Sequence, residues 1–190
     1  QNKKIVDQET LYHSIEKVLM GPERRSHIFS QKEKEIASYH EAGHALVAGV
    51  LPHSDPVHKI SVVARGSAGG YTLKLPLEDK HLYSKSEFLA DLAVLMGGYA
   101  AEKIVFKELT TGAASDLKKA TNLARRLVTE YGMSEKFGPI ALGEKEEMVF
   151  LGRDFGNEKN YSESVAELID KEIKEFIFTA FETAKKVISQ

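Results

Sequence analysis

Two histidines four residues apart, with a glutamate directly after the first, are the residues of this sequence best suited to chemistry. They lie in the run HEAGH, as His40, Glu41 and His44. On a helix, residues four apart lie one above the other, so both imidazoles can reach one metal ion. Zinc lowers the pKa of a water that it binds to about 7, and an adjacent carboxylate can take the proton. This spacing predicts a metal-dependent hydrolase in which Glu41 is the general base.

A catalytic zinc usually has three protein ligands, and the third is not obvious. A metzincin would need glycine and histidine where Val47 and Val50 stand. A thermolysin-like site would need a glutamate on the next helix. The only carboxylate between Glu41 and Glu78 is Asp55, which precedes a proline in a predicted loop. Neither familiar arrangement fits.

Two later carboxylates, Glu102 and Asp116, are the remaining candidates for the third ligand. Each also has an ordinary role: Asp116 can offset the dipole at a helix start, and Glu102 can pair with a surface lysine one turn away. Asp116 follows a loop of small residues, which positions a short carboxylate well. The residues alone favour Asp116 modestly and leave Glu102 open.

Hydrophobic periodicity shows which elements must position these groups. A capping box, Ser30 with Glu33, starts the helix that carries the two histidines, and Ser84 with Glu87 and Ser164 with Glu167 start two others. The pattern predicts helices over 8–20, 31–49, 84–106, 115–131 and 164–188. It predicts strands over 59–64 and 71–75, joined by a turn at 65–70, and a short strand at 148–151. The expected fold is mainly helical, of the α+β class, with one small antiparallel sheet; no alternating βαβ pattern supports a Rossmann-type fold.

Composition limits the class of protein further. The chain has 190 residues, a net charge of −2 and no cysteine. A disulfide framework, a thiolate zinc site and a cysteine nucleophile are therefore excluded, and no basic surface for nucleic acid is expected. The sequence contains no run of about 18 apolar residues, the length needed to span a bilayer. We expect a polar N-terminal tail at residues 1–6 and a single domain at 7–190.

Four motifs, in the same order along the chain, carry a family resemblance. They are YHEAGHA (39–45), GGYAAE (97–102), TGAASDL (111–117) and YGMS (131–134). Together they resemble the peptidase domain of the FtsH family, the membrane-anchored ATP-dependent zinc proteases, over nearly the whole chain. The resemblance implies that Zn²⁺ is held by His40, His44 and Asp116, with Glu41 catalytic. Glu102 would then be a supporting acid.

The resemblance also implies a biological setting. It implies a zinc endopeptidase that degrades unfolded or membrane protein substrates fed to it by an ATPase module, in membrane protein quality control. The expected assembly is a homo-oligomer, a hexameric ring, on the cytoplasmic side of the bacterial inner membrane. The ATPase and transmembrane parts are not expected in this chain, which should itself be soluble, without membrane contact or nucleic-acid partner. The run 138–145 (GPIALGEK) misses the phosphate-binding motif G-x-x-x-x-G-K-[ST] at Glu144 and is interpreted as a loop.

Substrate contacts are expected along the predicted hairpin. Its second strand could pair with the backbone of an extended polypeptide, which would make Gly70, Tyr71, Thr72 and Leu73 substrate-binding residues. The alternative is a hairpin that only covers the core. The segment 132–161 is either a plain connection or a rim at the substrate entrance. Two competing hypotheses remain: a non-catalytic helical adaptor or oligomerisation domain, and a zinc peptidase of another family that uses Glu102.

Overall fold

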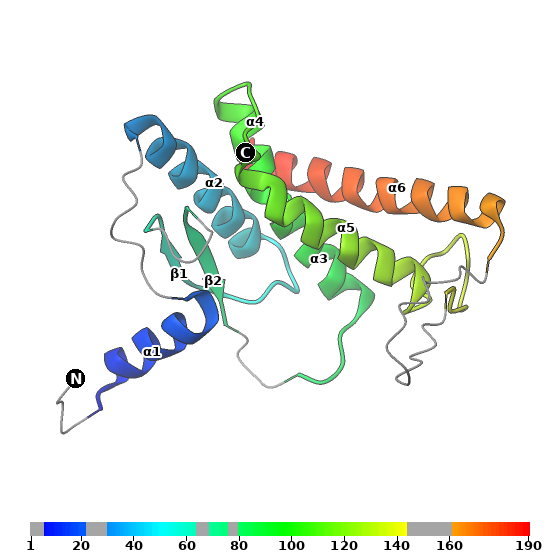
Figure 1. Cartoon of the computed structure of the whole chain (residues 1–190), viewed down its shortest axis with the longest axis horizontal. Coiled ribbons are helices and arrows are strands. Elements are labelled where there is room, and N and C mark those ends of the chain that lie inside the picture. The colour runs from blue at the N-terminus through cyan, green and yellow to red at the C-terminus, as the bar shows by residue number, and fades with distance from the viewer. Residues whose placement is uncertain (1–5, 22–29, 64–68, 76–79, 144–160) are drawn as a thin grey trace, which may run out of the picture.

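The computed structural model describes residues 6–21, 30–63, 69–75, 80–143 and 161–190 (Figure 1). Within them the chain is mainly helical with one two-stranded antiparallel sheet, which confirms the predicted fold class. The elements are α1 (Gln8–Met20), α2 (Gln31–Val50), β1 (Val57–Ser61), β2 (Tyr71–Lys74), α3 (Lys85–Leu95), α4 (Gly97–Val105), the 3-10 turn η1 (Thr111–Ala113), α5 (Ala114–Thr129) and α6 (Glu163–Ile188).

The apolar core lies among the five helices from α2 to α6. In Figure 1 the long helix α6, orange to red, runs along α5 and α3, and the hairpin lies beside α2. The core includes the fully buried side chains of Val47, Leu92, Leu127, Val128 and Ile169, one or two from each of four helices. Burying such side chains is the main favourable term in folding. This core holds α2, the carrier of the HEAGH run, in a fixed position.

Two glycines allow α2 and α4 to cross with their backbones in contact. A Cβ added to Gly43 would lie 2.5 Å from the carbonyl oxygen of Gly97, and one added to Gly97 would lie 2.7 Å from that of Gly43. Real side chains do not fit at such distances. The glycine inside the HEAGH run, which costs about 1 kcal/mol relative to alanine in a helix, is explained by this close approach.

The predicted helix over 84–106 is wrong in one respect, because it is two helices. α3 ends at Leu95 and α4 starts at Gly97, with Met96 between them at φ −80° and ψ −6°. Apolar periodicity continues through this point, so the pattern could not reveal the break. Gly97, the first residue after this break, lies against Gly43 and His44 of α2.

Most of the predicted helix starts are confirmed. Ser30 with Glu33 and Ser84 with Glu87 form complete capping boxes. The start of the last helix is corrected: Ser162, not Ser164, is its N-cap and accepts a hydrogen bond from the backbone N–H of Val165. Ser164 instead lies in the first turn. The two serines are separated only by Glu163, and the backbone geometry shows which of them caps the helix.

The hairpin is confirmed with shifted bounds. The first strand begins at Val57 and ends at Ser61, whereas 59–64 was predicted; the second ends at Lys74. Ile60 pairs with Thr72 and Ser61 with Tyr71, and the register shifts between Val57 and Lys59. The prediction relied on the run of β-branched residues, which carries no sign of that irregularity. Most of the predicted turn at 65–70 and the predicted strand at 148–151 lie outside the described residues.

The N-terminal helix α1 contacts the hairpin. Its buried Glu16 accepts hydrogen bonds from Lys59 at 2.6 Å and from the hydroxyl of Tyr71 at 3.3 Å. Among the described helices, none combines the length and the apolar character needed to cross a membrane. The predicted boundary between a tail at 1–6 and a domain at 7–190 stays a prediction.

Candidate metal centre and active site

The three predicted ligands lie together. The Nε2 atoms of His40 and His44 are 3.0 Å apart. The Oδ2 atom of Asp116 lies 3.2 Å from the first and 3.3 Å from the second. The two histidines come from the middle of α2, and Asp116 comes from the first turn of α5. Both imidazoles are buried, so the group faces little solvent.

The partners of the other ring nitrogens show which atoms are available as metal ligands. Nδ1 of His44 lies 2.6 Å from the carbonyl oxygen of Val94, which can only accept, so this nitrogen carries a hydrogen. Nδ1 of His40 lies 2.7 Å from a carboxylate oxygen of Glu102. With a hydrogen at Nδ1, each neutral imidazole presents its lone pair at Nε2. Two lone pairs and one carboxylate oxygen therefore converge, an arrangement that suits a cation between them.

These distances fit a tetrahedral metal ion. Zinc binds histidine nitrogen and carboxylate oxygen at about 2.0–2.1 Å, which places tetrahedral ligand atoms about 3.3 Å apart. The three separations of 3.0, 3.2 and 3.3 Å are close to that value. Nitrogen and oxygen donors of this kind also suit zinc. The residues thus fit the ion that the sequence predicts, and three protein ligands leave one position open.

The electrostatics of the cluster favour a bound cation. Burial alone would raise the pKa of Asp116, but the neighbouring imidazoles of His40 and His44 outweigh it and hold this pKa well below its ordinary value. Burial also disfavours the charged form of His40, yet hydrogen bonds with Asp116 and Glu102 leave its pKa raised. A cation at the centre would supply the positive charge that these carboxylates attract.

Glu102 lies behind the cluster. Its side chain is 1% exposed. One oxygen contacts Nδ1 of His40, and the other accepts a hydrogen bond of 2.9 Å from the backbone N–H of Thr110. The ordinary role considered for it, a pair with a surface lysine, is wrong. A carboxylate on the far nitrogen of a histidine ligand fixes the ring orientation and the tautomer.

Glu41, the predicted general base, is buried beside the cluster. Its side-chain oxygen Oε2 accepts a hydrogen bond of 2.8 Å from the hydroxyl of Thr72, and the same hydroxyl lies 3.1 Å from its carbonyl oxygen. A Cβ added to Gly70 would lie 2.9 Å from Cγ of Glu41. The hairpin therefore packs directly against Glu41.

The four predicted substrate-binding residues lie at the beginning of β2 and just before it. Tyr71 and Leu73 are buried, Gly70 contacts Glu41, and Thr72 hydrogen-bonds it. In the described part of the chain, β2 is paired with β1 alone. Its side chains thus serve the core and Glu41, and only its backbone along the second edge is left for a substrate.

Sequence reasoning missed three contributions. The contact of the Val94 carbonyl with His44 could not be predicted from residue type, because every residue has a backbone carbonyl. The residue pattern predicts substrate binding for Thr72 but gives no sign of its hydrogen bond to Glu41. Gly98 could have been found: a Cβ there would lie 2.4 Å from the His40 ring. Two adjacent glycines inside an apolar helical pattern are costly, and this cost indicates a close approach.

Comparisons with known proteins agree with this geometry. The sequence model of peptidase family M41 matches residues 27–190. The chain is 55% identical over 190 residues to "ATP-dependent zinc metalloprotease FtsH 1" of Sphaerobacter thermophilus, covering all of this chain and 29% of that protein. It is 54% identical over 188 residues to the protein of the same name from Thermomicrobium roseum, covering 99% of the chain and 29% of that protein. It is 49% identical over 190 residues to "ATP-dependent zinc metalloprotease FtsH" of Caldicellulosiruptor bescii, covering all of this chain and 31% of that protein. The chain thus spans less than a third of the length of these curated relatives.

Proposed function

The chain belongs to peptidase family M41, and from this we propose that it is the zinc endopeptidase part of a longer ATP-dependent protease. The observation that carries the proposal is the convergence of three electron-pair donors, from His40, His44 and Asp116, beside a buried glutamate. When bound, zinc acts as a Lewis acid that lowers the pKa of water and polarises a carbonyl oxygen.

The residues around the site have distinct proposed roles. His40, His44 and Asp116 hold the metal, and Glu102 and the Val94 carbonyl fix the two imidazoles through their Nδ1 hydrogens. Glu41 accepts a proton from the attacking water and returns it to the leaving amine. The negative charge of Glu41 acts on His40, which supports its place beside the metal site. Burial at this site excludes bulk water and strengthens these interactions.

We propose that an extended substrate pairs with the edge of β2 that faces away from β1, at residues 70–73. The support is the contact of this strand with Glu41, which places a backbone edge next to the proposed general base. A peptide substrate with a single N-methylated amide near the cut bond tests this, because the methyl group removes one donor. We expect a KM raised about fivefold for at least one methylated position, as a lost hydrogen bond costs about 1 kcal/mol. Unchanged KM at every position would place the substrate elsewhere.

The setting of the whole protein forms part of the proposal. The names of the relatives include ATP dependence, and this chain spans 29–31% of their length. We therefore propose that an ATPase module on the full-length chain feeds protein substrates to this domain. The hexameric ring and the cytoplasmic side of the bacterial inner membrane rest on the resemblance to the FtsH family. Cross-linking and protease accessibility of the full-length protein test both.

The function is tested with the chain and the variant Glu41→Gln, each loaded with zinc. We expect about one zinc per chain in both, released by a chelator. The wild-type chain should hydrolyse an unfolded, casein-like substrate, and the variant should lose this activity because an amide cannot accept the proton. Near-normal hydrolysis by the variant would remove Glu41 from its role. No zinc after reconstitution, and no hydrolysis, would favour the adaptor hypothesis.

A further inference from the structure

One face of α1 contacts both strands of the hairpin. The rings of Tyr12 on α1 and His58 on β1 have their centroids 4.8 Å apart. One turn further along α1, Glu16 accepts hydrogen bonds from Lys59 on β1 and from Tyr71 on β2. Tyr12 and Glu16 are four residues apart, so they lie on the same face of the helix. In Figure 1 one end of α1, in blue, lies against the hairpin, and the other extends away from the core helices.

The irregularity in β1 fits the hairpin to this helix face. In a regular strand neighbouring side chains point to opposite faces, and a bulge re-aims one of them. The register of β1 shifts between Val57 and Lys59, at His58. His58 and Lys59 are neighbours in sequence, yet both contact α1. The shift in register therefore serves the contact with α1.

Glu16 is the charged centre of the contact. It is 3% exposed, and a carboxylate taken out of water is costly unless it is paired. Its oxygens lie 2.6 Å from Nζ of Lys59 and 3.3 Å from the hydroxyl of Tyr71. Moving the hairpin away from α1 would separate these groups and leave a charge without them, which is strongly unfavourable. The contact thus fixes the hairpin relative to α1.

Two neighbouring residues tie β2 to two different helices. Tyr71 reaches Glu16 on α1, and the hydroxyl of Thr72 donates a hydrogen bond of 2.8 Å to the carboxylate of Glu41 on α2. Because Tyr71 and Thr72 share a peptide bond, a displacement of one displaces the other. The contact with α1 is therefore transmitted to the proposed general base.

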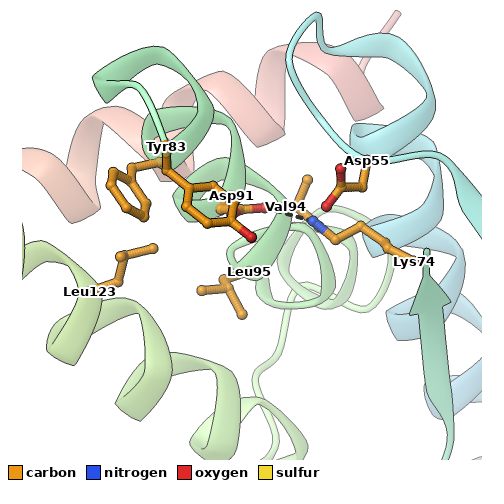
Figure 2. Close-up of a pocket in the computed structure, with 8 residues that line it drawn as sticks. Asp55, Lys74, Tyr83, Asp91, Val94, Leu95 and Leu123 are labelled. Atoms are coloured by element: carbon orange, nitrogen blue, oxygen red, sulfur yellow. Dashed lines mark hydrogen bonds and ion pairs between the residues drawn. The ribbon is translucent and has the colours of Figure 1, made fainter. Parts of the chain in front are cut away.

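The other end of β2 has a weaker anchor. Figure 2 shows Lys74 extending toward Asp91 of α3, with which it forms an ion pair of 2.6 Å. The Lys74 and Asp91 side chains are 22% and 36% exposed, so water and salt screen their attraction. Glu16 is far more buried, and its contacts are screened less. The start of β2, where Thr72 lies, thus depends mainly on α1.

We propose that Glu16 is a positioning residue for peptide hydrolysis: from α1 it holds the hairpin in the place where Thr72 orients Glu41. The inference rests on the proposed peptidase function, in which Glu41 is the general base. α1 ends at Met20, before residues 27–190 that match the peptidase family. Full turnover by the matched part of the chain therefore requires a helix that lies outside it.

The test compares Glu16→Ala with Lys17→Ala, both zinc-loaded, on a peptide substrate. Glu16→Ala should lower kcat about five- to tenfold, because Glu41 loses its orientation while the metal ligands stay in place. Glu16→Gln should restore part of kcat, since its amide oxygen still accepts from the hydroxyl of Tyr71. Lys17→Ala changes the exposed neighbour on the same helix and should behave as wild type. Wild-type kcat in Glu16→Ala would overturn the inference.

A double-mutant cycle separates positioning from a general loss of structure. Thr72→Val already lacks the hydrogen bond to Glu41, so adding Glu16→Ala to it should change kcat by less than about twofold. Lys59→Met removes the partner on β1 instead, and it should lower kcat in the wild-type chain but not in Thr72→Val. An equal fall of kcat in both backgrounds would show that Glu16 acts independently of Thr72 and would overturn the inference.

A measurement without catalysis separates the inference from the proposed function. In the isotopically labelled chain, the methyl NMR signal of Thr72 reports the place of the hairpin against α2. It should shift in Glu16→Ala and stay in place in Lys17→Ala, with circular dichroism as the check on folding. An unchanged Thr72 signal in Glu16→Ala would overturn the inference whether or not the chain cuts protein. A shifted signal, together with no hydrolysis by the zinc-loaded wild type, would instead contradict the proposed function and leave the hold of Glu16 on the hairpin intact.

Discussion

The hydroxyl of Thr72 on β2 donates a hydrogen bond of 2.8 Å to the carboxylate of Glu41 on α2. The two residues are far apart in sequence, and this bond joins the hairpin to the helix that carries both histidines. A hydrogen bond to a carboxylate contributes about 1.5–3 kcal/mol and fixes the orientation of the group. The strand thus orients the proposed general base.

Replacing Thr72 by valine tests this relationship. Valine keeps the branched shape and the strand preference of threonine and removes only the hydroxyl. We expect kcat to fall about tenfold with little change in KM, because the bond acts on Glu41 and leaves the backbone edge intact. Steady-state kinetics on a peptide substrate measure both constants, and Thr72→Ser should restore most of kcat. A variant that changes KM alone would make Thr72 a substrate contact.

The comparison of Asp116→Ala with Glu102→Gln tests the ligand set. Asp116→Ala removes one of three donors, so zinc affinity should fall by more than about 100-fold, whereas Glu102→Gln, behind His40, should cost about 10–100-fold. Competition with a chelator of known affinity measures both in one experiment, and circular dichroism checks folding. Wild-type affinity in Asp116→Ala with a large loss in Glu102→Gln would assign the third ligand to Glu102.

Alanine at Gly98 should damage the metal site through sterics alone. Its Cβ would lie 2.4 Å from the ring of His40, so the imidazole must move away from Glu102 and Asp116. We expect a loss of zinc affinity of about tenfold or more, with the helix itself favoured by alanine. Gly49→Ala is the matched control, since nothing lies within 4 Å of its added Cβ. Equal zinc affinity in the two variants would show that the His40 ring has room to adjust.

The start of α3 should respond to acid. Hydrogen bonds from Lys80 and Ser84 lower the pKa of Glu87 to about 2, from an ordinary value of 4.5. A lowered pKa means that the contribution of Glu87 is fully present above pH 4.5 and is lost as the pH falls to about 2. The Tm difference between wild type and Glu87→Gln should therefore shrink across this range. In a Lys80→Met background the difference should be smaller at every pH in the range; an undiminished difference would contradict the assigned cause.

Features that depend on local spacing could be predicted from the residues alone. The separation of His40 from His44 places both on one helix face wherever that helix lies, and the capping boxes at Ser30 and Ser84 start their helices through neighbouring residues. The small sheet followed from β-branched runs. These features could be predicted because a helix or strand repeats its geometry over a few residues.

The packing of the helices determines which distant groups meet at the two histidines. Asp116 reaches the Nε2 atoms and Glu102 reaches Nδ1 of His40, although both were open as ligands from their residue types. The break at Met96, the crossing of Gly43 with Gly97 and the place of Val94 behind His44 could not be predicted either. Each depends on how α2, α3, α4 and α5 pack, and packing joins residues that no local periodicity relates.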